Sequence, residues 1–488
     1  MLFNSYEFIF LFLPITFFVY FYLNSKRLTE ASKGFLVASS LFFYSWWNVI
    51  YLPLILASML FNYLLGASLT KESQHKKVSK KQLLSMGIVA NVALLGYFKY
   101  SDFFIDNLNK ALGSDMALLH LALPLAISFF TFQQIAYLVD SFRGETKEDD
   151  FLNYALFVTF FPQLIAGPIV HHKEVMPQFA SSWNKVKNYR NIALGLFIFS
   201  IGLFKKVVIA DTFAVWATQG FDVATALTFF EAWATSLSYT FQLYFDFSGY
   251  TDMAIGAALL FNIKLPINFD SPYKATDIQD FWRRWHITLS RFLKDYIYIP
   301  LGGNRAGSFR TYTNLMATFI LGGLWHGAGW TFVFWGFLHG LALVIHRIWH
   351  SLGFRLWTWL AWFITFNFVN ISWVFFRAKE WEDAVKVLRG MGGLSGVVVA
   401  EKYEKYLSKL SEYGVEFGIV TTNIQSGSQI IGWLVFALVV SLALKNSYKF
   451  TFEKKLHPLI IVFASFIFAY AMIGSLVSSS EVFLYFNF

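Results

Sequence analysis

Long apolar runs separated by short polar stretches dominate the pattern of hydrophobic and polar positions. The main runs cover residues 5–23, 34–47, 49–69, 82–100, 116–139, 226–260, 312–345, 356–376, 429–445 and 457–477, with a further one from 192 onward. Several approach or exceed the roughly 20 residues that a membrane-spanning helix needs. Alternating segments of about ten residues, the pattern of a membrane β-barrel, do not occur. The pattern therefore predicts an all-α polytopic membrane protein.

Composition supports this assignment. The 488 residues are 56% hydrophobic and 14% charged, whereas soluble domains carry about 25% charged residues. The formal net charge is +9, but the basic residues sit in short loops, which is a topology signal of membrane proteins rather than a nucleic-acid footprint. The chain contains no cysteine, so disulfides, thiolate metal sites and an S-acyl intermediate on this chain are excluded.

The basic loops orient the predicted spans. The first span, 5–23, lacks a basic leader and a cleavage site, so we expect it to be retained. Basic residues follow it and none precedes it, which places the N-terminus outside. By the same rule, the stretches 26–33, 71–81, 143–150 and 262–310 are cytoplasmic, and the charge-balanced stretch 377–426 and the tail 478–488 are external.

Two apolar regions break the simple pattern. Residues 151–170 include Pro162 and Pro168, which predict a broken or re-entrant helix; such backbone is tolerated at membrane depth only inside protein or beside water. The run 312–345 would rise roughly 50 Å as one helix, scarcely enough for two spans and a turn. A re-entrant segment or tightly bent hairpin centred on its glycines is expected there.

The basic stretch 262–310 contains eight Lys and Arg against four Asp. Thr276 and Gln279 fit a capping box, so a helix is predicted to begin there. Trp282 and His286 then share its apolar face. We expect an amphipathic helix at the membrane surface.

A histidine inside an apolar segment is the first candidate for chemistry. The segment LGGLWHGAGWTFVFWGFLHG (321–340) contains His326 close to Gly322, Gly323, Gly327 and Gly329. An ionisable side chain in such a segment is costly and is by default a functional hypothesis. The glycines let backbones approach and leave room for a thin substrate. A neutral imidazole can act as a general base toward a hydroxyl; the alternative is a core histidine bonded to a backbone carbonyl.

Several long motifs resemble the membrane-bound O-acyltransferase family, in particular its bacterial branch that O-acetylates polysaccharides outside the inner membrane. The resemblance runs nearly end to end, through MLFNSYEFIFLFLP, YFDFSGYTDMAIG, FWRRWHITLSRFLKDYIYIPLGGNR, LGGLWHGAGW and WVFFRA. It implies a single membrane domain of about 11–12 spans with re-entrant pieces and a central tunnel.

The resemblance also implies roles for residues. His326 matches the family's catalytic histidine. His286, in WRRWH, matches a second functional histidine that orients the acyl donor or lines the tunnel; an interfacial role is its alternative. The nearby basic residues either set topology and contact anionic lipids or bind the phosphates of coenzyme A: Arg283, Arg284, Arg291, Lys294 and Arg305.

The chain ends in FLYFNF, an F-x-Y-x-x-F pattern. It is similar to a terminal acyl-carrier motif of this branch and of the small partner in teichoic-acid D-alanylation. The resemblance implies that Tyr485 accepts acetyl on its phenolic oxygen, and a phenol can serve as a nucleophile in a chain without cysteine. An aromatic anchor at the membrane interface is the alternative.

The expected protein is thus an O-acetyltransferase of the bacterial inner membrane with both termini periplasmic. The resemblance implies acetyl-CoA as donor and a periplasmic serine-hydrolase-like (SGNH) transferase as partner, which acetylates peptidoglycan or alginate. No metal is expected, because the HxxxH spacing at 346–350 is a weak signal, and no nucleic acid. Alternatives are D-alanyl or other acyl transfer to teichoic acid or lipid, and a transporter that moves an acyl carrier without chemistry.

Overall fold

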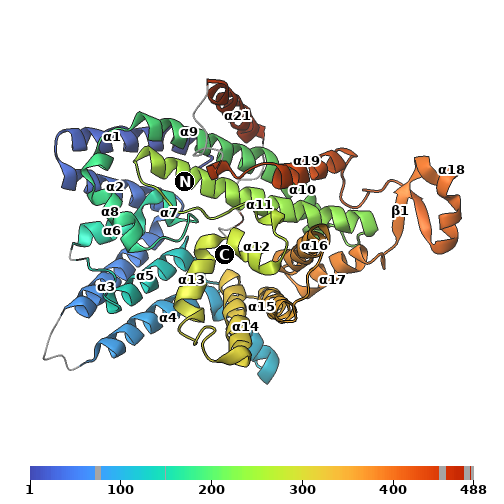
Figure 1. The fold of residues 1–488 in the computed structure, drawn as a ribbon, viewed down its shortest axis with the longest axis horizontal. Helices are drawn as coiled ribbons and strands as arrows, with labels where there is room; N and C mark the ends of the chain where they lie inside the picture. The colour runs from blue at the N-terminus through green and yellow to red at the C-terminus, as the bar shows by residue number, and fades with distance from the viewer. Residues whose placement is uncertain (72–77, 149, 450–457, 478–483, 485–488) are drawn as a thin grey trace.

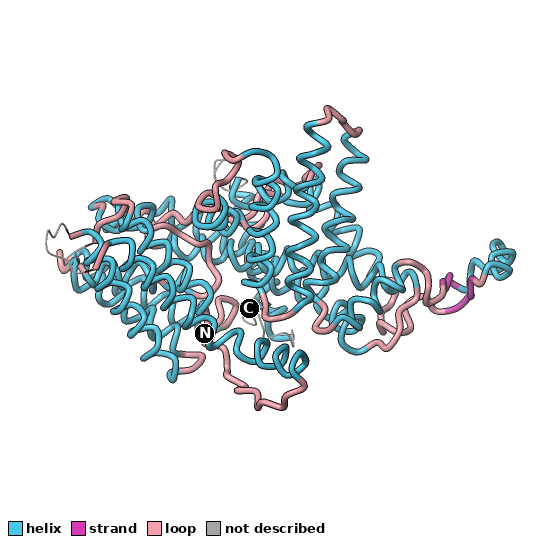
Figure 2. Tube along the Cα trace, turned by 90° about the horizontal axis from the view of Figure 1, so that it is seen from below, coloured by secondary structure: helices cyan, strands magenta, loops and turns pink. Residues whose placement is uncertain are grey.

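Helices form nearly all of the regular structure, which confirms the predicted all-α class. The computed structural model describes residues 1–71, 78–148, 150–449, 458–477 and 484. Within these ranges the strands are β1 (Val397–Ala400) and β2 (Val415–Gly418), which pair in parallel. Most of the helices pack side by side in one bundle, and the segment with β1 and β2 projects from its edge (Figures 1 and 2).

The polytopic membrane class is also confirmed. In the described part of the chain, six helical stretches are long and apolar enough to cross a membrane: Glu7–Ser25, Val49–Thr70, Lys80–Leu112, Tyr189–Val223, Trp330–Ser351 and Thr358–Arg377. Two shorter apolar helices follow near the C-terminus. The larger number of spans expected from the sequence stays a prediction.

The N-terminal helices correspond to the first predicted spans, but the span predicted at 116–139 is helical only from Ile127. They are α1 (Leu13–Ser25), α2 (Thr29–Ser45), α3 (Leu52–Thr70), α4 (Lys80–Leu112) and α5 (Ile127–Phe142). α4 begins with a capping box between Ser79 and Gln82, and it ends at Gly113 in the left-handed conformation, with φ +64°. It therefore continues well beyond the predicted boundary at residue 100.

The predicted break within 151–170 is confirmed. The chain forms α6 (Phe151–Thr159), α7 (Phe161–Leu164) and α8 (His172–Ala180). Phe160 separates α6 from α7, because its ψ of 107° is not helical. The amide of Phe161, next to this break, is buried and donates to Ser40 Oγ at 3.1 Å.

A long buried helix, α11 (Phe229–Leu260), crosses the middle of the bundle (Figure 1). It packs on α9 (Tyr189–Phe204), which continues through a π-helical turn into α10 (Asp211–Thr218). The backbones of α9 and α11 touch, because a Cβ on Gly202 would lie 2.5 Å from the carbonyl oxygen of Gly249. Small residues at such crossings are typical of helix packing in membranes.

The predicted hairpin at 312–345 is confirmed as α14 (Gly307–His326) and α15 (Trp330–Ser351). Residues 327–329 connect them. The two helices approach closely at glycines: a Cβ on Gly323 would lie 2.3 Å from Phe332 O, and one on Gly336 would lie 2.3 Å from Phe319 O.

The predicted start of a helix near residue 276 is confirmed, but the prediction of one continuous helix is wrong. Two short helices replace it, α12 (Ile278–Arg284) and α13 (Ile287–Leu293). The N-cap of α12 is Asp277, whose side chain accepts the amide of Asp280, rather than Thr276. Trp282 and His286 are buried inside the bundle.

The C-terminal part completes the bundle. Its helices are α16 (Thr358–Arg377), α17 (Trp381–Met391), α18 (Glu404–Leu407), α19 (Gln429–Ala443) and α21 (Pro458–Val477). The stretch 377–426 contains both strands, and its external location stays a prediction.

Gly336→Ala should lower the stability of the protein. The added methyl group meets backbone on α14, and overpacking of this kind costs about 1–3 kcal/mol. The matched control is Gly96→Ala in α4, where no atom lies within 4 Å of the added carbon. There the substitution should stabilise by about 0.5–1 kcal/mol, because alanine favours helix. Thermal unfolding in detergent measures both, and equal stability of the two variants contradicts the close helix contact.

Candidate functional site

His326 is the last residue of α14 and is buried, with 2% of its surface exposed. Three aromatic rings surround the imidazole: Trp325, Trp335 and Phe376, with centroid distances of 4.9, 5.2 and 5.0 Å. The expected position deep in the protein is confirmed. The glycines next to it allow close packing rather than an opening, because a Cβ on Gly327 would lie 2.2 Å from the Phe332 ring.

His286 occupies the break between α12 and α13. Its backbone is left-handed, with φ +42°, and its side chain is fully buried. A non-glycine residue in this region is uncommon and stays there only when its surroundings hold it. The surroundings here include the edge-on ring of Phe247, with a centroid distance of 4.8 Å.

Asn268 holds His286 in place. Its Oδ1 accepts from His286 Nδ1 at 3.1 Å, and also from the amide and hydroxyl of Thr288 at 3.2 and 2.9 Å. Because this oxygen can only accept, Nδ1 carries the proton and Nε2 carries the lone pair of the neutral ring. His286 lies outside the six candidate spans, and burial lowers its pKa to about 3. The neutral form is therefore the relevant one.

The structure places His326 near His339 and Lys99. The centroid of the Trp335 ring lies 5.2 Å from that of His326 and 4.8 Å from that of His339, and Lys99 Nζ donates to His326 O at 3.2 Å. His339 lies on α15 and is fully buried. It accepts from Trp282 Nε1 at 3.1 Å and contacts Ser372 Oγ at 2.9 Å. Both ring nitrogens are thus engaged, so His339 joins α12, α15 and α16.

Sequence reasoning missed Asn268, Lys99 and His339 as members of this region. His339 shared the signal that singled out His326, an ionisable group in an apolar segment. Asn268 has no local signal. Lys99 looked like a residue at the end of a span, because the apolar run stops near residue 100.

The five basic residues predicted to bind coenzyme A fall into two groups. Arg284 pairs with Asp280 at 2.9 Å, and Arg291 makes a bidentate pair with Glu174 at 2.5 and 3.0 Å. The other members are exposed: Arg283, Lys294 and Arg305. A phosphate that binds these three exposed residues would not have to displace a carboxylate from them.

Tyr485 lies outside the described residues. Its neighbour Leu484 is described, and the amide of Leu484 donates to Asp246 Oδ2 on α11 at 3.2 Å. Asp246 also pairs with Lys206 at 2.8 Å, and both side chains are buried. The described residue of the tail therefore lies against the interior of the bundle.

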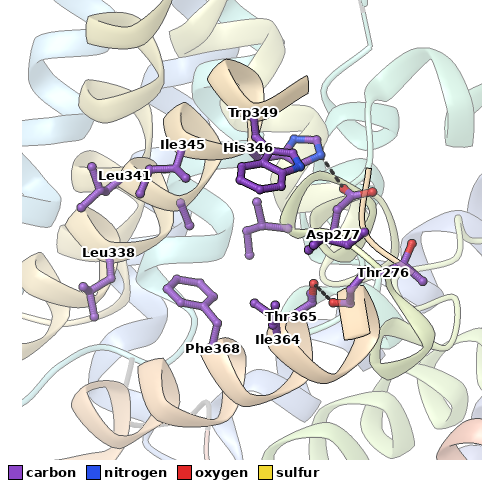
Figure 3. Close-up of a pocket in the computed structure, with 14 residues that line it drawn as sticks. Thr276, Asp277, Leu338, Leu341, Ile345, His346, Trp349, Ile364, Thr365 and Phe368 are labelled. Atoms are coloured by element: carbon purple, nitrogen blue, oxygen red, sulfur yellow. Dashed lines mark hydrogen bonds and ion pairs between the residues drawn. The ribbon is translucent and has the colours of Figure 1, made fainter. Parts of the chain in front are cut away.

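Two cavities differ in chemistry. One of about 440 Å³ lies between α15 and α16 and is almost entirely apolar (Figure 3). Its polar end is a contact between His346 and Asp277 at 3.6 Å. The other, of about 330 Å³, is lined by Lys99 and Asp102 and by Gly327, the residue that follows His326. This second cavity is the one that reaches the hairpin tip.

The adjacent histidines 171 and 172 are buried and paired. His171 contacts Asp140 at 3.4 Å and His172 contacts Glu148 at 3.1 Å. Burial opposes ionisation of Glu148, but the hydrogen bond from His172 helps to hold the pKa of this carboxyl below its usual value. Across the described residues no group of three or more His, Cys, Asp or Glu side chains is placed to hold a metal ion.

Comparisons with known proteins agree with the motifs. The model of the MBOAT, membrane-bound O-acyltransferase family, matches residues 7–380. The chain is 50% identical to a peptidoglycan O-acetyltransferase of Helicobacter pylori, over 100% of this chain and 98% of that protein. It is 40% identical to the probable alginate O-acetylase AlgI of Pseudomonas aeruginosa, over 90% and 81% of the two chains. A teichoic acid D-alanyltransferase of Streptococcus thermophilus is 30% identical over 52% of this chain.

Asn268→Leu should lower both stability and acyl transfer. Three buried donors lose their acceptor, and an unsatisfied buried donor costs about 1–3 kcal/mol. Asn268→Asp keeps an acceptor oxygen and should retain more of both properties. Thermal unfolding and a transfer assay measure the effects, with Asn304→Leu at an exposed turn as control. Wild-type behaviour of Asn268→Leu rules out the holding role.

Proposed function

The chain belongs to the membrane-bound O-acyltransferase family, and from this premise we propose that it transfers acetyl groups from cytoplasmic acetyl-CoA to the outside of the bacterial inner membrane. O-acyltransferase activity follows from family membership. The observation that carries the proposal is the buried imidazole of His326 at the tip of the glycine hairpin. The end product is O-acetylation of a cell-envelope polysaccharide.

Peptidoglycan is the polymer that the relatives favour most. The Helicobacter pylori protein named for peptidoglycan is similar over the full length of both chains. The alginate relatives are less similar, and the D-alanyltransferases match only about half of this chain. Alginate-like polymers are therefore the second candidate.

The proposed reaction assigns a base and an acceptor. A hydroxyl oxygen attacks the thioester carbonyl, the new C–O bond forms and the C–S bond breaks. An imidazole nitrogen of His326 takes the hydroxyl proton and passes it to the leaving thiolate of coenzyme A. His286, held by Asn268, orients the donor.

Tyr485 is the proposed acceptor hydroxyl on this chain. A phenol acetylated there would carry the group as an ester to an external serine-hydrolase-like transferase. The contact between the Leu484 amide and Asp246 supports this part of the proposal, because it places the residue before Tyr485 against the interior of the bundle. An anchor in the lipid interface has no need of such an interior contact.

The proposed sidedness rests on the basic loops. α14 begins at Gly307, near the end of the basic stretch 262–310, and runs 20 residues to His326. Such a helix rises roughly 30 Å, which is about the thickness of the hydrocarbon core. His326 would then lie toward the outer side, where both termini and 377–426 are placed. A donor bound at exposed Arg283, Lys294 and Arg305 would extend its acyl arm inward.

Incubation of the purified protein with labelled acetyl-CoA should acetylate Tyr485. Intact-mass and peptide analysis should find the roughly 42 Da that acetyl adds at a phenol. His326→Ala should lower the rate by about 10²–10⁴-fold, the range of general-base catalysis. His350→Ala, at an exposed histidine, is the matched control.

The remaining outcomes separate the alternatives. Release of coenzyme A with no adduct in wild type or in Tyr485→Phe supports direct transfer to an external hydroxyl and removes Tyr485 from the reaction. Undiminished acetyl transfer by His326→Ala contradicts the proposed base. If acetyl moves across the membrane in that variant without any transfer reaction, the chain is a transporter.

A further inference from the structure

The C-terminal end of α14 is capped by side chains of another helix. The last four carbonyl groups of an α-helix have no partner within the helix. In α14 each of them accepts a hydrogen bond: Gly323 O from the Gly327 amide at 3.4 Å, Leu324 O from Tyr100 Oη at 2.7 Å, Trp325 O from Lys99 Nζ at 2.5 Å, and His326 O from Lys99 Nζ at 3.2 Å. Two consecutive residues of α4 therefore hold the last turn of α14.

Lys99 is an unusual residue at this position. It lies in α4, a candidate span, and an ionisable side chain inside such a segment is costly and marks a function by default. A cation at a helix C-terminus is favourable, because it meets the negative end of the helix dipole and the unpaired carbonyls. Its placement thus matches a capping role.

The donors of Lys99 are all used within the protein. An ammonium group has three N–H donors, and Lys99 Nζ contacts Trp325 O, His326 O and also Ser128 Oγ at 3.2 Å. No donor is left for a reacting carbonyl. Lys99 therefore acts through the backbone of His326 rather than on the substrate.

Aromatic rings next to His326 add to the contact between Lys99 and the end of α14. Lys99 Nζ lies 5.7 Å from the centroid of the Trp325 ring, within reach of a cation–π interaction. Phe132 stacks on the same indole at 4.9 Å. The ammonium group thus fixes both the carbonyl and the ring of the residue before His326.

We propose that Lys99 and Tyr100 are positioning residues for His326, which fix the end of α14 beside the cavity of about 330 Å³. The inference rests on the proposed function of His326 as the base. Without the caps, the last turn of α14 loses its partners and His326 shifts relative to that cavity. A misplacement of about 1 Å costs roughly 10²-fold in rate.

The test uses the full-length protein and labelled acetyl-CoA. Lys99→Met keeps the length of the side chain and removes charge and donors. It should lower kcat by about 10²-fold and leave the KM for acetyl-CoA unchanged. Lys99→Arg keeps a cation with donors and should restore most of the rate. The control is Lys110→Met on the same helix, at an exposed lysine paired with Asp106, and it should behave as wild type.

Tyr100→Phe gives a second test that changes no charge. It removes one hydroxyl and should lower kcat by a smaller factor at unchanged KM. If Lys99→Met does not fold, Tyr100→Phe tests the proposal in its place. Wild-type kcat in Lys99→Met or in a folded Tyr100→Phe overturns the proposal, as does an arginine variant no faster than the methionine variant. Activity retained in His326→Ala instead overturns the proposed function, so the two failures are distinguishable.

Discussion

A helix that ends inside a membrane-embedded bundle must find hydrogen-bond partners for its backbone without help from water. This constraint explains where several buried polar side chains of the protein lie. Ser40 accepts a backbone amide at the break next to Phe160, and Asn268 accepts one at the break next to His286. Lys99 and Tyr100 donate to the carbonyl groups at the end of α14. Each of these side chains bonds to backbone at an interruption of a helix.

The same constraint links structure to chemistry. His286 and His326 are found at interruptions, where the backbone turns. Aromatic rings enclose His326 and an amide oxygen fixes the tautomer of His286. In the proposed reaction, groups held in this way would need little reorganisation, and such preorganisation is a large part of catalysis. The apolar cavity between α15 and α16 has no comparable polar groups, apart from the His346 contact.

The sequence predicted features that depend on local patterns. Apolar runs gave the membrane class, Pro162 signalled the broken helix, and the glycines around His326 signalled the hairpin. Features that depend on distant partners were missed or wrong. No glycine or proline marks the break at His286, which depends on Asn268. The two residues that cap α14 lie more than 220 positions before the carbonyl groups to which they donate.

The most direct test of transmembrane acetyl transfer uses proteoliposomes that contain the protein in one orientation. Acetyl-CoA, labelled on both the acetyl group and the coenzyme, is supplied at the cytoplasmic face, with the external transferase and a glycan on the other side. The account predicts that acetyl label appears on the glycan while the coenzyme label stays at the cytoplasmic face. Passage of both labels together, or acetyl transfer confined to the cytoplasmic face, would contradict it.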